Sequence, residues 1–473
     1  MISDIKIKGP VWICFLCLLA SQLSCRGQED HDPWEKARSI ASEIAHTSFP
    51  DQVYLITDFG ALADDGNTDW EAIKQAINQC AASGGGKVLV PPGIFRTGPL
   101  TLHSDVNLHL DSGAVLEFST RPEDYLPVVR SRWEGVDCYN YSPLIYAFKS
   151  RNIAITGKGI LDGRACDTIW WSWKGRQEYG WKEGMLNQDN PAGRPRLLSM
   201  MENGTDVENR IMGENAYLRP PFVQFFQCST VLVEDVTIKN SPFWLIHPVL
   251  TDNIIIRGVR AESHGPNNDG CDPESSRNVL IENCFFDTGD DCIAIKSGRN
   301  EDGRKWGVPT ENVLIRNCNM KNGHGGVVIG SEISGGCRNV FVEDCLMDSP
   351  ELERAIRIKT NSFRGGIVEN LFVRNVEIGQ VREAVLKINC QYDMKDREQG
   401  EFMPLVRNIR LEDISSRESK YAIFLLGIEG EDVIQGILIR NARFDGVREG
   451  NFIRFAGDPE MHRVYINDVL AGE

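Results

Sequence analysis

Short apolar stretches that alternate with polar residues recur along the chain from about residue 150. Each stretch begins with an Asn and leads into a turn that contains Asn or Asp, as in NIAITG at 152, NVLIENC at 278, NVLIRNC at 312 and NVFVEDC at 339. β-Branched residues with a period of 2 indicate strands, and their repetition between Gly- and Asn-rich turns is typical of a parallel β-solenoid. Each coil buries its apolar face only by stacking on neighbours about 4.8 Å away. The pattern predicts an all-β, single-stranded right-handed parallel β-helix.

The segment before the repeat has a different periodicity. A helix is predicted over residues 69–82, where four apolar residues recur at helical spacing: Trp70, Ile73, Ile77 and Cys80. Thr68 or Asp69 would cap its start, and a run of glycines from Gly84 would end it. A helix at this place would cover the open end of the solenoid and shield its first strand edge.

The repeat is interrupted between Gly163 and Pro221 by a stretch rich in Trp, Gly and Pro. No low-complexity linker separates this stretch from the coils on either side. We interpret residues 164–221 as a long insertion that emerges from the solenoid, within one domain that spans residues 51–473.

The N-terminus has the features of an export signal. Two lysines precede an apolar run from Val11 to Leu19, which is too short to cross a membrane as a permanent helix. The run leads to the sequence QLSC, which resembles a bacterial lipoprotein cleavage site with Cys25 as the lipidated residue. Lipidation and ordinary cleavage both remain open. We expect residues 1–25 to be the signal, residues 26–50 a tether and N-terminal segment, and the protein to be exported to the periplasm or held at the cell surface as a lipoprotein.

The net charge of −16 narrows the set of partners. Nucleic acid and anionic membrane surfaces repel a strongly acidic protein, so neither is expected to bind it. The same charge would repel an acidic polysaccharide, so such a substrate requires a cleft that is locally basic. We expect membrane contact only through the lipid anchor, and we expect a monomer.

Fourteen cysteines in an exported protein would ordinarily suggest disulfides. Cys284, Cys318 and Cys345, however, each end a similar apolar segment. This placement predicts free thiols that stack in the core as small hydrophobic side chains. After the signal, the sequence contains no Cys-x-x-Cys pair of the kind that binds zinc.

Aligning the segments that follow each repeat start brings chemically active residues together. Asp290 and His324 each lie 12 residues after the Asn of their repeat, and matching Cys271 to Cys292 places Asp269 in the same register. By strand alternation, six polar residues then point out of the coils on one face: Asp269, Asp290, Lys296, His324, Arg357 and Lys359.

Carboxylates stacked on adjacent coils need a reason, because like charges at that distance destabilise a sheet. The arrangement raises the pKa of at least one carboxyl and is the kind that acid–base catalysis uses. Asp291 is the exception, since strict alternation would turn it inward, where a lone carboxylate is costly. A bend at Gly289 would bring it to the surface.

Four tripeptides carry a resemblance to a known family. They are Asn-Asn-Asp at 267–269, Gly-Asp-Asp at 289–291, Gly-His-Gly at 323–325 and Arg-Ile-Lys at 357–359. In this order and spacing they resemble the motifs of glycoside hydrolase family 28, the polygalacturonase family, and the likeness to a solenoid covers roughly residues 52–470. Asn268 departs from the family pattern, which usually has Thr there.

The resemblance implies that the chain hydrolyses α-1,4-linked galacturonic acid in pectin. Asp290 would be the general acid that protonates the glycosidic oxygen. Asp269 and Asp291 would hold and deprotonate a water on the opposite face of the sugar, and a water-sized gap between acid and base gives inversion at the anomeric carbon. His324 would tune the protonation and position of Asp290.

The resemblance also implies a substrate site for uronate. Arg357 and Lys359 lie at i and i+2 of one strand, so both can reach a single carboxylate. Asn267, in the first motif, belongs to the same substrate-binding set. Lys296 shares the slot of Lys359 two coils earlier, and it either contacts another uronate or is a solvated lysine. No metal or other cofactor is required, and the expected ligand is a pectic polysaccharide or an oligogalacturonide.

The insertion favours action from chain ends, because its aromatic and basic residues would wall off one end of the cleft: Trp170, Trp171, Trp173, Lys174, Arg176 and Trp181. Three other functions remain open. One is a calcium-dependent pectate lyase with Arg357 as the base, the second a hydrolase of the rhamnogalacturonan or xylogalacturonan backbone, and the third a non-catalytic glycan-binding solenoid. The stacked acids, His324 and the Arg-x-Lys pair favour hydrolysis.

Overall fold

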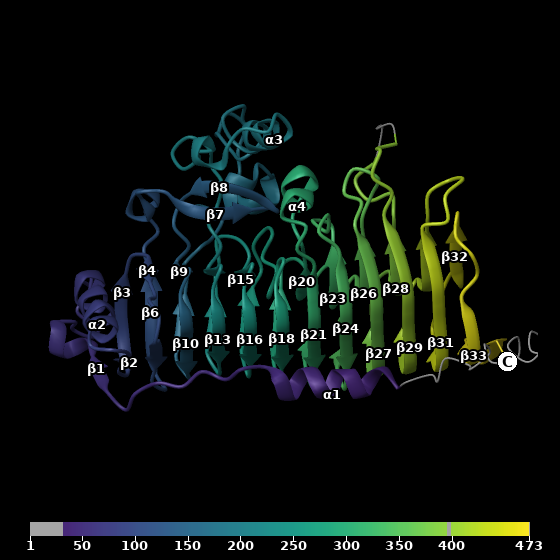
Figure 1. Ribbon diagram of the computed structural model, residues 1–473, viewed down its shortest axis with the longest axis horizontal. Coiled ribbons are helices and arrows are strands. Elements are labelled where there is room, and N and C mark those ends of the chain that lie inside the picture. Colours follow the sequence, from purple (N-terminus) through teal and green to yellow (C-terminus); the bar gives the residue numbers. More distant parts are fainter. Residues whose placement is uncertain (1–31, 395–398, 473) are drawn as a thin grey trace, which may run out of the picture.

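The computed structural model describes residues 32–394 and 399–472, and its strands form an elongated parallel β-helix (Figure 1). The predicted signal and Cys25 lie outside the described residues. The coils contribute to three rows of parallel strands, here called the first, second and third row. This confirms the predicted fold class.

Within the described residues, the first row is built from thirteen strands, seven of which contain the Asn of the repeat close to their start: β1 (Val53–Leu55), β2 (Gly86–Val90), β5 (Val106–Leu110), β10 (Arg151–Gly157), β13 (Ser229–Glu234), β16 (Asp252–Arg257), β18 (Arg277–Glu282), β21 (Thr310–Arg316), β24 (Cys337–Glu343), β27 (Ile367–Gln380), β29 (Leu405–Glu418), β31 (Ile434–Phe444) and β33 (Glu460–Ile466). The second row follows each of these after a short turn: β3 (Gly93–Thr97), β6 (Ala114–Phe118), β11 (Ile160–Asp162), β14 (Thr237–Lys239), β17 (Arg260–Ser263), β19 (Phe285–Thr288), β22 (Asn319–Met320) and β25 (Leu346–Met347). From β27 onward one long strand serves both rows.

The third row carries the site: β4 (Leu100–Thr101), β9 (Ile145–Phe148), β12 (Val223–Phe226), β15 (Ile246–Val249), β20 (Ile293–Ile295), β23 (Val327–Gly330), β26 (Arg354–Lys359), β28 (Ala384–Asn389), β30 (Tyr421–Leu426) and β32 (Asn451–Arg454). Isolated bridges at Cys271 and Glu274 join β15 to β20, so this row also runs along the solenoid. A short antiparallel strand, β34 (Val469–Gly472), pairs with β33 at the C-terminal end.

The Asn of the repeat has a structural role that explains its recurrence. Asn278, Asn312 and Asn339 have φ angles of 56°, 58° and 58°, in the left-handed region that Asn tolerates better than most residues. The side-chain amide of Asn312 donates to Asn278 at 3.1 Å, and that of Asn339 donates to Asn312 at 3.0 Å. The same residue therefore bends the chain and links successive coils.

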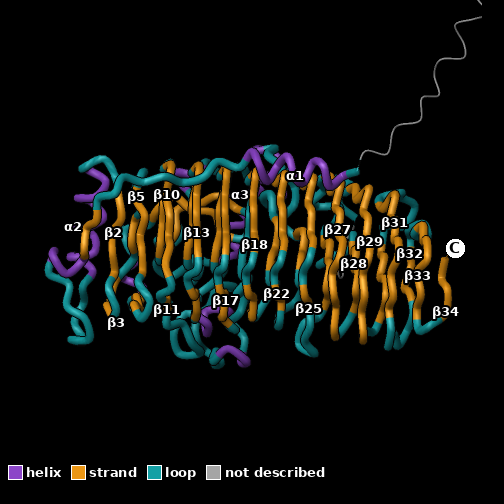
Figure 2. Tube along the Cα trace, turned by 90° about the horizontal axis from the view of Figure 1, so that it is seen from below, coloured by secondary structure: helices purple, strands orange, loops and turns teal. Residues whose placement is uncertain are grey.

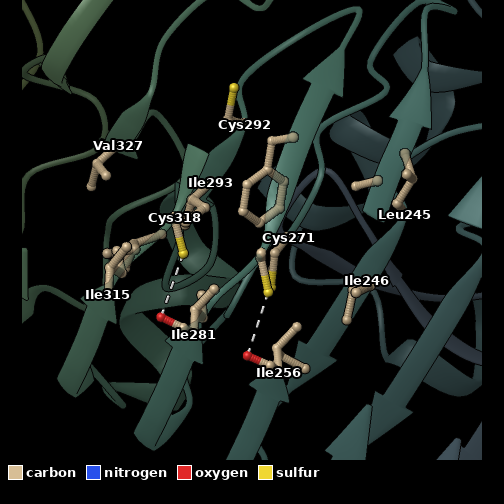
Figure 3. Packing of buried hydrophobic residues seen from close by; sticks show 14 of the residues in the cluster. Leu245, Ile246, Ile256, Cys271, Ile281, Cys292, Ile293, Ile315, Cys318 and Val327 are labelled. Carbon is tan, nitrogen blue, oxygen red and sulfur yellow. Dashed lines mark hydrogen bonds between the residues drawn. The ribbon is translucent and has the colours of Figure 1, made fainter. Parts of the chain in front are cut away.

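The core inside the coils is apolar and contains the predicted column of thiols. Cys284, Cys318 and Cys345 are buried, and every cysteine in the described part of the chain is free. Each thiol lies over a backbone carbonyl; Cys318, for example, donates to Ile281 at 3.7 Å (Figure 3). The prediction of stacked free thiols is confirmed.

Helix α2 (Trp70–Ala82) lies at the N-terminal end of the solenoid, as predicted (Figure 1). Ile73, Ala76, Ile77 and Cys80 are buried against the first coils. Asp69 occupies the N-cap position. Its carboxylate accepts from the backbone of Leu62 and Arg96 and so ties the helix to the neighbouring chain.

The segment before the solenoid contains a helix that the prediction of a tether and N-terminal segment over residues 26–50 did not include. Helix α1 (Pro33–Glu43) lies lengthwise across the outside of the first row (Figure 2). One apolar side of this segment packs on apolar side chains of five successive strands: Trp34, Ala37, Ile40 and Ile44 on Ile255, Leu280, Leu314, Phe341 and Phe372. The spacing of these four residues is helical and was the available signal.

The insertion leaves the solenoid after β11 and returns at β12. It forms the short helices η3 (Trp171–Lys174), η4 (Gln177–Tyr179) and η5 (Val207–Asn209) and the helix α3 (Arg194–Glu202). It packs on an antiparallel hairpin, β7 (Val129–Trp133) and β8 (Val136–Asn140), which sequence reasoning did not single out. Together with α4 (Asn300–Trp306), these elements rise above the middle coils of the third row (Figure 1). Among the described helices, none has the length and apolar composition needed to cross a membrane.

Candidate active site

A pocket of about 530 Å³ opens on the third row, between the insertion and the loops that follow β26 and β28. Seven of the eight residues predicted for the site line it: Asn267, Asp269, Asp290, Lys296, His324, Arg357 and Lys359. The eighth, Asp291, lies beside them: one carboxylate oxygen from each of Asp269, Asp290 and Asp291 lies within 4.8 Å of the other two. The structure therefore brings the whole predicted set together.

The predicted register is confirmed for Asp290 and His324. Strand β20 pairs with β23 so that these two residues are level, and His324 Nδ1 lies 2.9 Å from Asp290 Oδ1. Lys296 and Lys359 also share one slot two coils apart, as predicted, with Gly330 between them.

The predicted register of Asp269 is wrong by one residue. Cys271 pairs with Ile293 rather than with Cys292, so Asp269 is level with Asp291 and not with Asp290. The prediction matched Cys271 to Cys292 because they are the same type of residue. This coil pairs with the next one only through isolated bridges, so a shared residue type does not indicate which positions are level. The three carboxyls still meet, since neighbouring positions on adjacent coils lie within reach of each other.

Asp291 is not at the surface, where the expected bend at Gly289 would have placed it. Its side chain is fully buried, and Lys359 Nζ lies 2.7 Å and Arg357 Nη1 3.6 Å from its carboxylate oxygens. Two cations from the coil after next offset the cost of burying this charge. The other predicted residues do point out of the coils, but the insertion and loops cover them, so that Arg357 and Lys359 are each only 7% exposed.

The ammonium of Lys296 is surrounded by carboxylates and is not a solvated group. Its Nζ lies 3.5 Å from Asp269, 3.4 Å from Asp272 and 3.6 Å from Glu332, and it sits 4.5 Å above the ring of Trp244. Lys296 therefore balances negative charge at the pocket floor.

Asp272 and Glu332 were missed by sequence reasoning. Asp272 follows Asp269 at a spacing of three within one turn, which was a usable signal. Glu332 lies in a loop after β23 and reaches the site only through folding. Tyr392, with its ring 5.4 Å from the Arg357 guanidinium carbon, was missed for the same reason.

The carboxyls at the pocket floor have opposite electrostatic environments. Burial, and then the charges of Asp272 and Asp290, raise the pKa of Asp269 well above its usual range. Burial also raises the pKa of Asp272 to about 8. Burial acts in the same direction on Asp290, but the charge and hydrogen bond of His324 outweigh it and hold the pKa of Asp290 below its usual range. Asp290 in turn raises the pKa of His324.

The carboxyls at the pocket floor therefore differ in the protonation state that their surroundings favour. The raised pKa values of Asp269 and Asp272 favour their protonated forms, and the contact between Asp290 and His324 favours an ionised Asp290 and a protonated His324. Groups this close titrate together, so each proton belongs to a pair and not to one residue. The His324–Asp290 pair is thus suited to supply a proton, and further carboxylate oxygens lie beside it, which is the arrangement that acid–base hydrolysis requires.

Comparison with known proteins agrees with this chemistry. The model of glycosyl hydrolases family 28 matches residues 208–448, just over half of the chain, and the match includes all four motifs. An exopolygalacturonase of known structure from Thermotoga maritima is 44% identical, with a TM-score of 0.88 over 92% of this chain and 96% of that one. The chain belongs to glycosyl hydrolase family 28.

Two curated relatives of this family 28 enzyme are more distant. A probable polygalacturonase from Vitis vinifera is 28% identical over 82% of this chain and 73% of its own length. An exo-poly-alpha-D-galacturonosidase from Dickeya chrysanthemi is 26% identical over 89% of this chain and 72% of its own length.

The insertion of this family 28 enzyme is anchored at the pocket through Asn267. The carbonyl oxygen of the Asn267 side chain accepts from Lys174 Nζ and from Arg219 Nη2, both at 2.9 Å. Arg219 is fully buried and also donates to the backbone carbonyls of Pro242 and Pro266. Asn267 therefore holds the insertion in place, in addition to lining the pocket.

The pocket is basic although the protein is acidic. Its lining contains nine lysines and arginines and seven aspartates and glutamates, whereas the whole chain carries a charge of −16. The insertion supplies Lys174, Arg176 and Arg194 to this set, and Arg299 comes from the start of α4. Glu134 pairs with Arg194 and Arg299, each at 2.8 Å. The locally basic cleft that an acidic polymer would need is present.

Three clustered carboxylates can also suggest a metal site, so we considered whether a divalent cation fits. Each carboxylate already faces a cation of the protein: Lys296 for Asp269, His324 for Asp290, and Lys359 for Asp291. A divalent ion would have to displace these groups. The residues of this family 28 site do not fit a divalent metal as well as they fit one another.

Proposed function

We propose that this enzyme hydrolyses α-1,4-linked galacturonate in pectin and that it acts from chain ends. The observation that carries the proposal is the pocket floor, where the Asp290–His324 pair and the Asp269–Asp291 carboxyls lie within reach of one glycosidic bond. Arg357 and the nearby basic residues give the pocket the charge that a polyuronate requires. The family relationship to exopolygalacturonases supports the same substrate.

In the proposed mechanism, Asp290 gives a proton to the glycosidic oxygen and His324 supplies that proton through their 2.9 Å contact. A water held between Asp269 and Asp291 loses its proton to one of them and attacks the anomeric carbon, which breaks the glycosidic bond. Lys296 lies beside Asp269 and Lys359 beside Asp291, and each lysine stabilises the ionised carboxylate that can accept this proton.

Inversion of the anomeric centre stays a prediction. Inverting enzymes that use two carboxyls usually hold them about 6.5–9.5 Å apart, and the nearest oxygens here are within 4.8 Å. Three carboxyls are present here, however, so Asp269 and Asp291 can hold the water while Asp290 acts as the acid. Proton NMR of the first-formed product anomer tests the prediction directly.

Arg357 and Lys359 are proposed to bind the carboxylate of the uronate beside the bond that is cleaved. Both are mostly buried, and both lie near Asp291, which leaves their remaining donors aimed into the pocket. Lys296 is proposed to act by balancing Asp269 and not by contacting a second uronate, because carboxylates surround its ammonium.

Action from chain ends is proposed because the insertion closes the pocket on the N-terminal side. Lys174, Arg176 and Tyr179 come from this segment, and Arg194 at the start of α3 extends the same wall. A polymer that continued through this wall would meet the buried Arg219 network behind Asn267. The last sugar of a chain, in contrast, fits a closed end.

The decisive experiment is digestion of polygalacturonate with and without EDTA, following reducing ends, ultraviolet absorbance of unsaturated product and product size. We expect saturated monomer from the start, with equal rates in EDTA. Unsaturated product that EDTA abolishes would replace the hydrolase by a calcium-dependent lyase. Activity only on rhamnogalacturonan or xylogalacturonan would change the substrate, and binding without any product would indicate a glycan-binding protein.

We also propose that the enzyme is an exported monomer, lipidated at Cys25 or cleaved by an ordinary signal peptidase. The sequence of the first 25 residues supports export, and α1 begins only eight residues after Cys25. Fractionation of cells that express the protein and the Cys25→Ala variant, with mass spectrometry of the mature N-terminus, tests this proposal. Sedimentation of the purified protein tests the monomer.

A further inference from the structure

The outward positions of the third row continue past the pocket toward the C-terminal end. Arg357 on β26 is level with Lys387 on β28, Phe424 on β30 and Phe452 on β32. Coils about 4.8 Å apart place Phe424 roughly 10 Å and Phe452 roughly 14 Å from Arg357 along the solenoid. The two aromatic rings therefore lie in the same outward row of side chains as the proposed uronate-binding residue Arg357.

The rings on this path form a continuous platform. Phe424 and Phe452 stack with centroids 4.4 Å apart and planes 14° apart, and Tyr421 packs edge-on to Phe424 at 5.5 Å. Lys387 Nζ lies 4.5 Å above the Phe424 ring and also pairs with Glu383. Lys387 therefore places a cation between the pocket and these rings. We call Tyr421, Phe424 and Phe452 the aromatic platform.

A second phenylalanine pair in the molecule shows what a purely structural stack looks like. Phe341 and Phe372 stack at 5.3 Å on the outside of the first row, and Trp34 of α1 covers them. They are 1% and 8% exposed. The rings of the aromatic platform are only half-buried, at the last coils of the third row. Partly exposed aromatic rings in a row point to a ligand or a partner more than an isolated exposed residue does.

We propose that the aromatic platform binds the part of the galacturonan chain that lies beyond the pocket, on the leaving-group side. The proposal rests on the proposed function. The insertion closes the pocket at its N-terminal side, so a chain whose end is bound there has to extend toward the C-terminal coils. Pyranose rings present C–H faces that pack on aromatic rings, and Lys387 matches the negative charge of the polymer.

The test compares substrates that reach the platform with substrates that do not. The double variant Phe424→Leu, Phe452→Leu keeps apolar side chains on the strands but removes the flat ring faces. For digalacturonate, kcat and KM should equal those of the wild type. For polygalacturonate, KM should rise about fivefold to tenfold with unchanged kcat, because aromatic contacts of this kind are worth about a tenfold change in binding.

A matched control is available on the same sheet. Phe148 on β9 is also an outward aromatic residue of the third row, 36% exposed and stacked on Tyr146 at 6.3 Å, but it lies on the other side of the insertion. Phe148→Leu should leave KM for every chain length unchanged. Circular dichroism melts of all variants establish that they fold.

The outcomes separate the two proposals. An unchanged KM for polymer in the double variant overturns the platform while wild-type digestion upholds the enzyme. An equal loss on dimer and polymer also overturns it, since that reports damage to the fold. A second copy of the chain on the platform would appear as a concentration-dependent mass in sedimentation that the variant loses without a change in KM, and would overturn it too. A wild type that digests no galacturonan removes the proposed function and the platform together.

Discussion

Two sides of the pocket floor contain the same chemical group in opposite states. On the outer side Asp290 is 17% exposed at its side chain and contacts His324, which holds the pKa of Asp290 down. On the inner side Asp269 is 4% exposed at its side chain and lies among other carboxyls, and burial raises its pKa. The difference shows that the neighbouring groups decide the protonation of an aspartate, because the residue type is the same on both sides.

The largest effect should come from removing the outer carboxylate. Asp290→Asn should lower kcat about 10³-fold with little change in KM, because the amide cannot transfer a proton. Initial rates on trigalacturonate measure this. Asp287→Asn is the matched control, since Asp287 pairs with Lys321 and His264 outside the pocket and should leave kcat near that of the wild type. A loss below tenfold in Asp290→Asn would assign the acid to another group.

The second prediction removes the cation beneath the floor. Lys359→Met leaves Asp291 fully buried without its 2.7 Å partner, and removal of one member of a buried ion pair costs about 3–5 kcal/mol. We expect the free energy of unfolding in urea to fall by about 3 kcal/mol and kcat/KM to fall about 100-fold. Lys321→Met breaks an exposed pair and should cost less than about 1 kcal/mol. Equal costs for the two variants would contradict the burial argument.

The third prediction separates the two sides by pH. Because Asp290 raises the pKa of His324, the protonated pair and the activity should persist above the ordinary pKa of histidine and be lost as pH rises further. His324→Gln leaves Asp290 to carry the proton alone. The alkaline limb of kcat/KM should then move to lower pH by at least about one unit, with roughly a tenfold loss at the optimum. A pH profile of unchanged shape would show that His324 does not share the proton.

The smallest effect should come from Asp272, a carboxyl on the inner side of the pocket floor. The pKa of Asp272 is raised to about 8, so the folded protein binds a proton that the unfolded chain releases near pH 4. The stability from this group is complete at low pH and is lost as pH rises toward 8. Asp272→Asn mimics the neutral form, so its melting temperature should fall less than that of the wild type between pH 5 and pH 8. Parallel curves would show that Asp272 is ionised throughout.

Much of the fold follows from local pattern. The period-2 stretches, the Asn of each repeat and the helix over residues 69–82 could be read without a structure, because each depends on backbone preference and on one buried face. Helix α1 could have been predicted from the spacing of its apolar residues, but its position across the first row could not. The hairpin β7–β8 was missed because it packs on the insertion and not on the repeating core.

The candidate site likewise has features that the sequence determined and features that only the tertiary structure decided. The sequence by itself determined that Asp290, His324 and the Arg-x-Lys pair share one face, since strand alternation and coil length fix which side chains point outward. Only the tertiary structure decided the register of Asp269, the burial of Asp291 beneath Lys359 and the carboxylates around Lys296. These depend on contacts between coils and with the insertion, which set the dielectric surroundings and the charge partners of each group.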